Sequence, residues 1–177
     1  MNTTENLRFD NSVIVFLDNQ IHVLMSFREA STYAFIVTVY CCQLDWQVSF
    51  TVQISNALIQ VFSAVEHLTL RHEVHSQSSE EHNDVDRLEW RRLLRPFSNV
   101  KTLVVEDGLT EQLSRCLLLE DGELSLELLP KLQELTYSGS GDPGDAFTPF
   151  INAHQKAGRP VTLIRESSSS NPSVLIS

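Results

Sequence analysis

The chain has 177 residues with an apolar content of 42%, which suffices to bury roughly two-thirds of the unfolded surface in a single domain. Its 13 Lys and Arg residues and 23 Asp and Glu residues give a formal net charge of −10, so we expect no nucleic-acid partner. The three cysteines form no C-x-x-C pair, which argues against a disulfide framework or a zinc knuckle and favours a reducing compartment.

The N-terminal residues lack the features of a secretory signal. Residues 1–12 carry Glu5 and Asp10 against Arg8, and no apolar run in the chain approaches the roughly 20 residues of a membrane span. We therefore interpret residues 1–12 as an N-terminal tail and expect an intracellular protein, cytoplasmic or nuclear, with no membrane partner.

Three segments before residue 41 are typical of strands. Residues 13–17, 21–27 and 33–40 are rich in β-branched and aromatic side chains, and turn-forming residues such as Asp18 and Asn19 lie between the first two. They predict a β-rich N-terminal segment, which could be either a small antiparallel sheet or the degenerate first copies of a repeat.

Residues 44–62 fit two secondary structures. The segment 45–54 alternates apolar and polar residues like a strand, whereas Phe50, Ile54 and Leu58 also lie on one helical stripe. We favour a helix over 44–62, because the parallel strand predicted next needs a crossover before it.

Helices and strands alternate after a polar segment. Residues 73–86 hold five acidic residues and no Lys or Arg, which predicts a mobile acidic loop. Trp90, Leu93 and Phe97 share one helical face, and Pro96 ends that helix. The elements predicted beyond it are strand 100–105, helix 110–119, helical turn 124–129, strand 132–137, turn 138–145, a helix from Thr148 and Pro149 to Gly158, strand 161–164, and a disordered Ser-rich tail over 166–177.

A nine-residue pattern recurs along the chain. It reads FSAVEHLTL at 62–70 and FSNVKTLVV at 97–105, with a looser copy, LPKLQELTY, at 129–137. The spacings of 35 and 32 residues between copies exceed the roughly 20–29 of regular leucine-rich repeats, and one copy cannot bury its apolar side chains without a neighbour. The sequence therefore predicts an α/β fold over 13–165, an irregular leucine-rich-repeat-like half-solenoid with parallel strands and crossover helices, preceded by the β-rich segment.

Strand alternation predicts which side chains of the repeats face outward. Val65, Leu68 and Leu70 belong to the framework, and the residues between them project to the other side. Repeat proteins commonly bind partners on such a sheet surface. The candidate partner-binding residues are His67, Thr69, Arg71, Thr102, Val104, Glu106, Glu134, Thr136 and Ser138.

Longer stretches of the chain resemble a known family. Residues 44–53 (LDWQVSFTVQ), 90–151 and 157–165 (AGRPVTLIR) resemble the C-terminal halves of fungal F-box proteins with divergent leucine-rich repeats. The resemblance implies repeats that recognise protein substrates, and an F-box that binds the Skp-type adaptor of a cullin-RING ubiquitin ligase. An F-box-like Leu-Pro-x-Glu segment does not precede the repeats, so we do not expect this chain to bind the adaptor.

A glycine pattern raises the alternative of a nucleotide-binding enzyme. Gly139, Gly141 and Gly144 spell G-x-G-x-x-G between a predicted strand and a predicted helix. However, Asp142 would repel a pyrophosphate, and Pro143 removes a backbone N–H group that could bind it. We therefore favour an ordinary turn over a nucleotide site.

Other polar clusters also have plain structural interpretations. His72, His75 and His82 could ligate a metal, but their spacing on a strand end and loop gives no preset geometry, so we expect no metal site. An Arg stripe on the helix that carries Trp90, formed by Arg87, Arg91 and Arg95, is more typical of a solvated helix surface than of an acidic-partner patch. We interpret Trp46 and Trp90 as core anchors.

These observations together favour a non-enzymatic protein-binding module without a cofactor. The partner would be an unidentified protein substrate. A non-functional truncated paralogue remains the other alternative.

Overall fold

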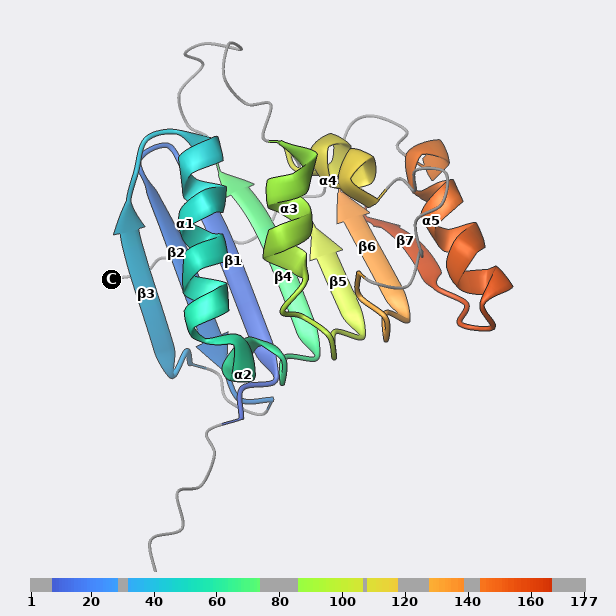
Figure 1. Ribbon diagram of the computed structural model, residues 1–177, viewed down its shortest axis with the longest axis horizontal. Helices are drawn as coiled ribbons and strands as arrows, with labels where there is room; N and C mark the ends of the chain where they lie inside the picture. The colour runs from blue at the N-terminus through green and yellow to red at the C-terminus, as the bar shows by residue number, and fades with distance from the viewer. Residues whose placement is uncertain are drawn as a thin grey trace, which may run out of the picture.

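A computed structural model of the chain describes residues 8–28, 32–73, 86–106, 108–117, 128–138 and 144–166. Its strands form one sheet of seven, in the order β3-β2-β1-β4-β5-β6-β7 (Figure 1). The protein is therefore a mixed α/β fold with a mostly parallel sheet. Within the described chain, none of the helices combines the length and the apolar character that a membrane span requires.

The three N-terminal strands are antiparallel to one another. They are β1 (Asn11–Leu17), β2 (Gln20–Ser26) and β3 (Phe35–Tyr40). The other edge of β1 pairs in parallel with β4 (His67–Glu73), with Asn11 opposite His67. The β-rich segment is thus a set of antiparallel strands that joins the parallel strands through β1, so it combines features of both sequence-based alternatives.

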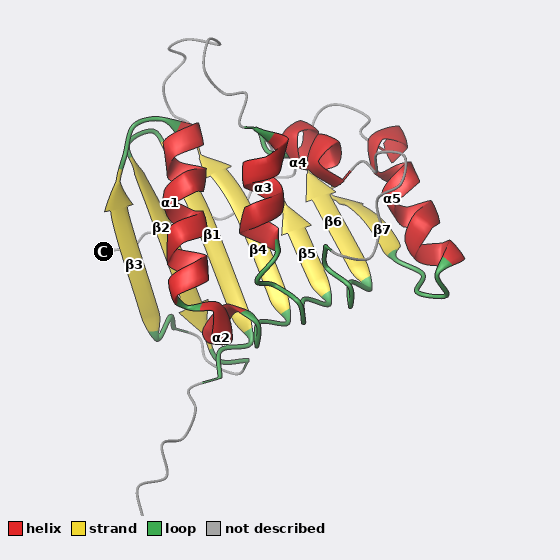
Figure 2. Ribbon diagram, viewed as in Figure 1, coloured by secondary structure: helices red, strands yellow, loops and turns green. Residues whose placement is uncertain are grey.

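Each parallel strand follows a helical crossover. Helices α1 (Leu44–Ala57) and α2 (Ile59–Phe62) precede β4, α3 (Arg87–Leu94) precedes β5 (Thr102–Val105), α4 (Thr110–Leu117) precedes β6 (Glu134–Ser138), and α5 (Gly144–Lys156) precedes β7 (Thr162–Glu166). The helix predicted over 44–62 is confirmed. Figure 2 shows all the helices in front of the sheet, so they cover one of its two faces.

The sequence repeats occupy equivalent positions in the sheet. Leu68, Leu103, Leu135 and Leu163 lie opposite one another in register, and the first three are fully buried. Full burial of each such leucine contributes about 2 kcal/mol. Leu163 is only half-buried, since β7 is the last strand of the sheet and has a neighbour on one side only.

Backbone hydrogen bonds repeat with the same period. The first N–H group of each parallel strand donates to the carbonyl group just before the neighbouring strand. The pairs are His67 to Asp10, Thr102 to Glu66, Glu134 to Lys101 and Thr162 to Gln133, at 2.9, 3.1, 3.0 and 2.8 Å. The ladder begins at Asp10, so β1 takes the place of a repeat strand despite belonging to the antiparallel segment.

Helix α1 is held in place through polar side chains as well as apolar ones. Leu44, Val48 and Val52 are buried on one side of the helix. The buried Gln47 amide donates to the carbonyl groups of Leu17 and Cys41 at 2.7 and 2.6 Å, which ties the start of the helix to the sheet. These buried donors need such partners because an unpaired amide in the core is costly.

Trp46 is not a core anchor. Its side chain is 57% exposed, whereas Trp90 is fully buried and stands edge-on to Phe16 with ring centroids 5.7 Å apart. Trp46 is two residues from Leu44, which rotates it about 200° around the helix and away from the sheet. The interpretation of Trp90 is confirmed, and that of Trp46 is wrong.

Several element boundaries also differ from the prediction by a few residues, as at α5, at β1, and at Glu166, which belongs to β7 and not to the predicted tail. Helix α5 begins at Gly144 and contains Pro149, so Thr148 and Pro149 are not its start. A proline there removes a single hydrogen bond near the helix N-terminus, which the helix tolerates. Strand β1 begins at Asn11, and the buried Phe9 stacks on Phe27, so order starts within the predicted tail.

Several predictions fall outside the described residues. They concern most of the acidic loop over 73–86, the turn over 138–145 before Gly144, residues 124–127 of the predicted helical turn, and the Ser-rich tail beyond Glu166.

Candidate binding face of the sheet

The sheet face away from the helices carries the nine predicted partner-binding residues. Their positions form three rows that cross the sheet. His67, Thr102 and Glu134 are one set of register partners, and Thr69, Val104 and Thr136 are the next. Arg71, Glu106 and Ser138 are the following residues of this face on the same strands. The structure therefore brings together residues that are up to 71 positions apart in the chain.

The middle row continues across all seven strands without a charged residue. Register pairing links Thr69 to Val13 on one side and Thr136 to Ile164 on the other, and Val13 links to Leu24 and then to Ile36. We call this set the apolar row; its members are Ile36, Leu24, Val13, Thr69, Val104, Thr136 and Ile164. The row is exposed at its two ends, by 58% at Ile36 and 37% at Ile164.

The central part of the face is less accessible than alternation predicts. Thr136 is only 5% exposed, and the other eight candidate residues are half-buried. On the neighbouring strands Thr136 lies opposite Val104 and Ile164. Leu24 is also buried, although it lies outside the main core cluster between sheet and helices.

An ion pair borders the apolar row on one side. Arg71 on β4 pairs with Glu106, which follows β5, at 2.7 Å between Nε and Oε1. Burial raises the pKa of the Glu106 carboxyl, and the nearby Arg71 guanidinium partly opposes this effect. A desolvated ion pair beside an apolar row can discriminate between partners by charge complementarity.

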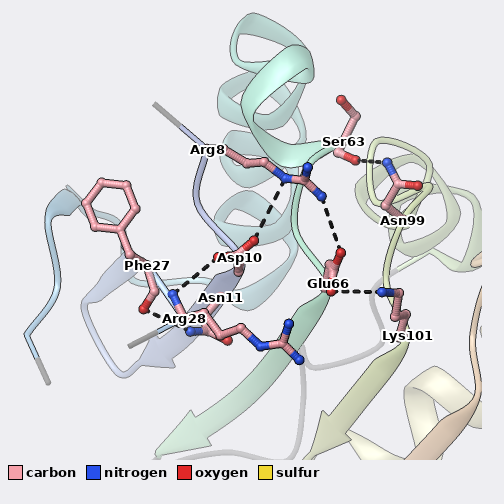
Figure 3. A network of polar contacts seen from close by, with 9 residues as sticks. All are labelled: Arg8, Asp10, Asn11, Phe27, Arg28, Ser63, Glu66, Asn99 and Lys101. Atoms are coloured by element: carbon pink, nitrogen blue, oxygen red, sulfur yellow. Dashed lines mark hydrogen bonds and ion pairs between the residues drawn. The ribbon is translucent and has the colours of Figure 1, made fainter. Parts of the chain in front are cut away.

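The strand starts are joined by a second polar network. Figure 3 shows Glu66, just before β4, between Lys101 before β5 and Arg8 before β1, with distances of 2.9 and 3.3 Å. The hydrogen bond from Lys101 lowers the pKa of the Glu66 carboxyl. Asn99 strengthens the same junction by donating to the Ser63 carbonyl at 2.5 Å. This network fixes the relative positions of three neighbouring strands, and so the spacing of the rows.

Sequence reasoning missed four members of the apolar row. Ile36, Leu24 and Val13 belong to the antiparallel strands, and Ile164 to the last strand, all outside the three recognised repeats. Period-two alternation in the predicted strands identifies which residues share a face. The pairing of β1 with β4 aligns the first three with the repeat residues, and the pairing of β6 with β7 aligns Ile164.

The residues that suggested a nucleotide site or a metal site are only partly described by the structure. Gly139 and Gly141 lie outside the described residues, as do His75 and His82. Among the residues that the structure describes, no group of three His, Cys, Asp or Glu side chains is placed to hold a metal ion. On α3, Glu89 forms its ion pair with Arg92, which is not part of the predicted stripe.

No protein-family model matches the chain, and no significant match to a curated protein was found.

Proposed function

We propose that the chain is a non-enzymatic protein-binding module built as an irregular leucine-rich-repeat-like half-solenoid. Three observations support the proposal for the fold. Strands β1 and β4 to β7 follow one another across the sheet, the crossover helices lie on one face, and the nine-residue repeats fall in register. Such stacking is how repeats bury apolar positions that a single copy cannot cover.

The apolar row carries the proposal for binding. It crosses the face that the described helices leave open, it contains no charge, and the Arg71–Glu106 pair borders it. The proposed partner is a protein with an apolar strip and charges complementary to that border. By this proposal the partner is a substrate-like protein of the cytoplasm or nucleus, and neither a Skp-type adaptor nor nucleic acid binds the chain directly.

A pair of matched variants tests this assignment. Ile36 and Leu88 are 58% and 57% exposed, but Ile36 ends the apolar row whereas Leu88 lies on α3 in the helical layer. Proteins captured from the source organism's lysate by the wild-type chain would be purified and their affinities measured for both variants. Ile36→Glu should weaken the affinity for a true partner by about tenfold, which corresponds to roughly 1.4 kcal/mol of binding free energy. Leu88→Glu should weaken it by less than about twofold.

A triple variant tests the charged residues on both sides of the apolar row, since Arg71 and Glu106 border it on one side and Glu134 lies in the row on its other side. Alanine at Arg71, Glu106 and Glu134 should also weaken the affinity for the partner. Circular dichroism would verify that the variant is folded. A partner whose affinity is unchanged by Ile36→Glu and by the triple variant, or direct binding of a Skp-type adaptor, would overturn the proposal.

A further inference from the structure

The outer edge of β3 is an unprotected end of the sheet. β3 is the terminal strand in the sheet order, so among the described residues it pairs with a strand on one side only, through β2. Figure 1 places it at the left end of the sheet, outside α1. The main-chain N–H and C=O groups along such an edge are a template for pairing with another strand.

β3 lacks the features by which proteins block pairing at a sheet edge. Its sequence, FIVTVY, contains no charged residue and no proline, and its register with β2 runs without a bulge from Phe35 to Tyr40. β7, at the other end of the sheet, carries Arg165 and Glu166, and such charges discourage strand pairing. The two ends of the sheet therefore differ, and β3 is the end suited to pairing.

The register with β2 determines which main-chain groups of β3 point outward. The Cys41 N–H group donates to the Asn19 carbonyl at 2.9 Å, in line with the pairing of the two strands. In an antiparallel pair, alternate residues direct their N–H and C=O groups to the partner strand. The strand residues at even spacings from Cys41 therefore bond to β2. The other three residues of β3 direct these groups to the open edge; they are Ile36, Thr38 and Tyr40.

The side chains of the same three residues are exposed on the open face of the sheet. Ile36 is 58% exposed, and Tyr40 is 78% exposed, more than any other large apolar side chain that the structure describes. Thr38 lies between them, with its hydroxyl oxygen 2.9 Å from Nδ1 of His22. A single exposed apolar side chain is ordinary, but two on one unpaired strand can be covered together by one added strand.

We propose that β3 pairs antiparallel with β3 of a second copy of this chain, so that the two sheets join around a two-fold axis at Thr38. Opposite residues in a sheet share a face, so the axis has to pass through a residue and not between two residues. With the axis at Thr38, Ile36 lies opposite Tyr40 of the second copy, and Thr38 lies opposite its own counterpart. Pairs of an aliphatic with an aromatic side chain, and pairs of threonines, stabilise sheets.

The main-chain groups favour this position of the axis. All three outward residues find partners in this register, which gives about six hydrogen bonds between the copies. An axis at Val37 would pair only two of them, with about four hydrogen bonds, and would leave Tyr40 without an opposite residue in the strand. The edge is thus complementary to itself, whereas a strand of another protein would have to reproduce this match.

The inference goes beyond the proposed function, because it concerns the edge of the sheet and requires no other protein. A two-fold axis perpendicular to the sheet leaves both open faces on the same side, so the dimer would present one continuous open face. Ile36 belongs to the edge and to the apolar row, and for that reason the test substitutes Thr38 instead. The self-association of the pure chain can then fail without affecting the proposed function.

Sedimentation equilibrium of the full chain measures the association. A salt concentration of about 0.15 M screens the repulsion between two chains of net charge −10. One strand pair buries less than a standard interface of about 1,600 Å², so we expect a reversible dimer with a dissociation constant on the order of 10 µM.

A lysine on each outer strand provides a matched pair of variants. Thr38→Lys places two like charges opposite each other at the axis and should weaken the dimer at least about tenfold. Thr162→Lys, on β7, should leave the dissociation constant unchanged. Both threonines are exposed, and circular dichroism would verify that the variants are folded.

A mixture of two charge variants tests the position of the axis. Thr38→Lys and Thr38→Glu should each associate weakly alone, because each charge faces its own copy. Mixed in equal amounts, they should form a heterodimer at least as tight as the wild-type dimer, because opposite charges then face each other. A contact that does not bring Thr38 next to its counterpart would not show this pattern.

Three outcomes would overturn the proposal. One is a wild-type chain that stays monomeric at about 200 µM, roughly twentyfold above the expected dissociation constant, which would leave the edge to a strand of a different protein. Another is a dimer that Thr38→Lys weakens no more than Thr162→Lys does, which would place the contact elsewhere. The third is a mixture of Thr38→Lys and Thr38→Glu that does not associate.

Discussion

The antiparallel strands β1 to β3 and the parallel strands β4 to β7 share one sheet but are covered to different extents. In the parallel part, Leu68, Leu103 and Leu135 are fully buried under the helices. In β3, by contrast, Phe35 and Val37 are only half-buried. A parallel connection has to carry the chain back across the sheet, and here each one carries a helix, whereas a hairpin turn brings no cover with it.

This difference shows where the protein is well packed and where it is open. Helix α1 packs against β2 in the antiparallel part, and the cover becomes thin at β3. The other end of the sheet, β7, is also incompletely covered, as the half-buried Leu163 shows. The exposed ends of the apolar row, Ile36 and Ile164, lie on these same two outer strands.

The largest expected loss of stability comes from a substitution in the parallel part of the sheet. Leu103→Asp places a carboxylate in a fully buried position between β4 and β6, and should cost at least about 4 kcal/mol and unfold the domain. Val37→Asp on half-buried β3 should cost less than half as much. Urea unfolding followed by circular dichroism measures both, and equal costs would show that the two parts are equally packed.

A smaller effect compares two glycines of the parallel part. Gly108, near the end of β5, has φ +91°, and a Cβ atom there would lie 2.9 Å from His72 Nδ1. Gly158, before β7, has φ +73° with open space around it. We expect Gly108→Ala to cost about 2 kcal/mol and Gly158→Ala about 1, because only the first adds a clash to the backbone strain. Thermal unfolding should place the Gly108 variant clearly lower, and the reverse order would contradict tight packing at the sheet centre.

The smallest effect is a pH dependence of stability. His154 on α5 is fully buried, neither ring nitrogen has a hydrogen-bond partner among the described residues, and burial lowers the pKa of its imidazole. The unfolded chain therefore takes up a proton more readily than the folded one, so the free energy of unfolding should fall as the pH drops below the ordinary histidine pKa of about 6.5. Burial also lowers the pKa of His72.

Urea unfolding at a series of pH values measures this slope. His154→Leu should reduce the slope without abolishing it, since His72 contributes in the same direction. Both histidines lie in the parallel part, so hydrogen exchange at acidic pH should increase in α5 before it increases in β1 to β3. An unchanged slope in the variant would exclude His154 as its cause.

Local sequence patterns predicted the elements better than their arrangement. The repeats identified the inward leucines, and the helix over 44–62 followed from the need for a crossover before β4. The exposure of Trp46 was missed because a helical stripe shows which residues share a face without showing which face meets the sheet. A groove between α1 and α3 was missed for a related reason, since two of its seven described lining residues, Asp86 and Glu89, come from the start of α3, about 40 residues along the chain.

By itself the sequence determined the alternation of strands and helices, the register among the three repeats, and the nine residues on one sheet face, because these depend on periodicities of two and 3.6 residues within short segments. The tertiary structure alone decided that β1 pairs with β4, which extends the three repeat positions of the apolar row onto the antiparallel strands β1 to β3. That pairing joins segments more than 50 residues apart, and any β-branched strand of similar length could satisfy its hydrogen bonds. Which strand does so depends on the packing of the whole core, a property that no local pattern carries.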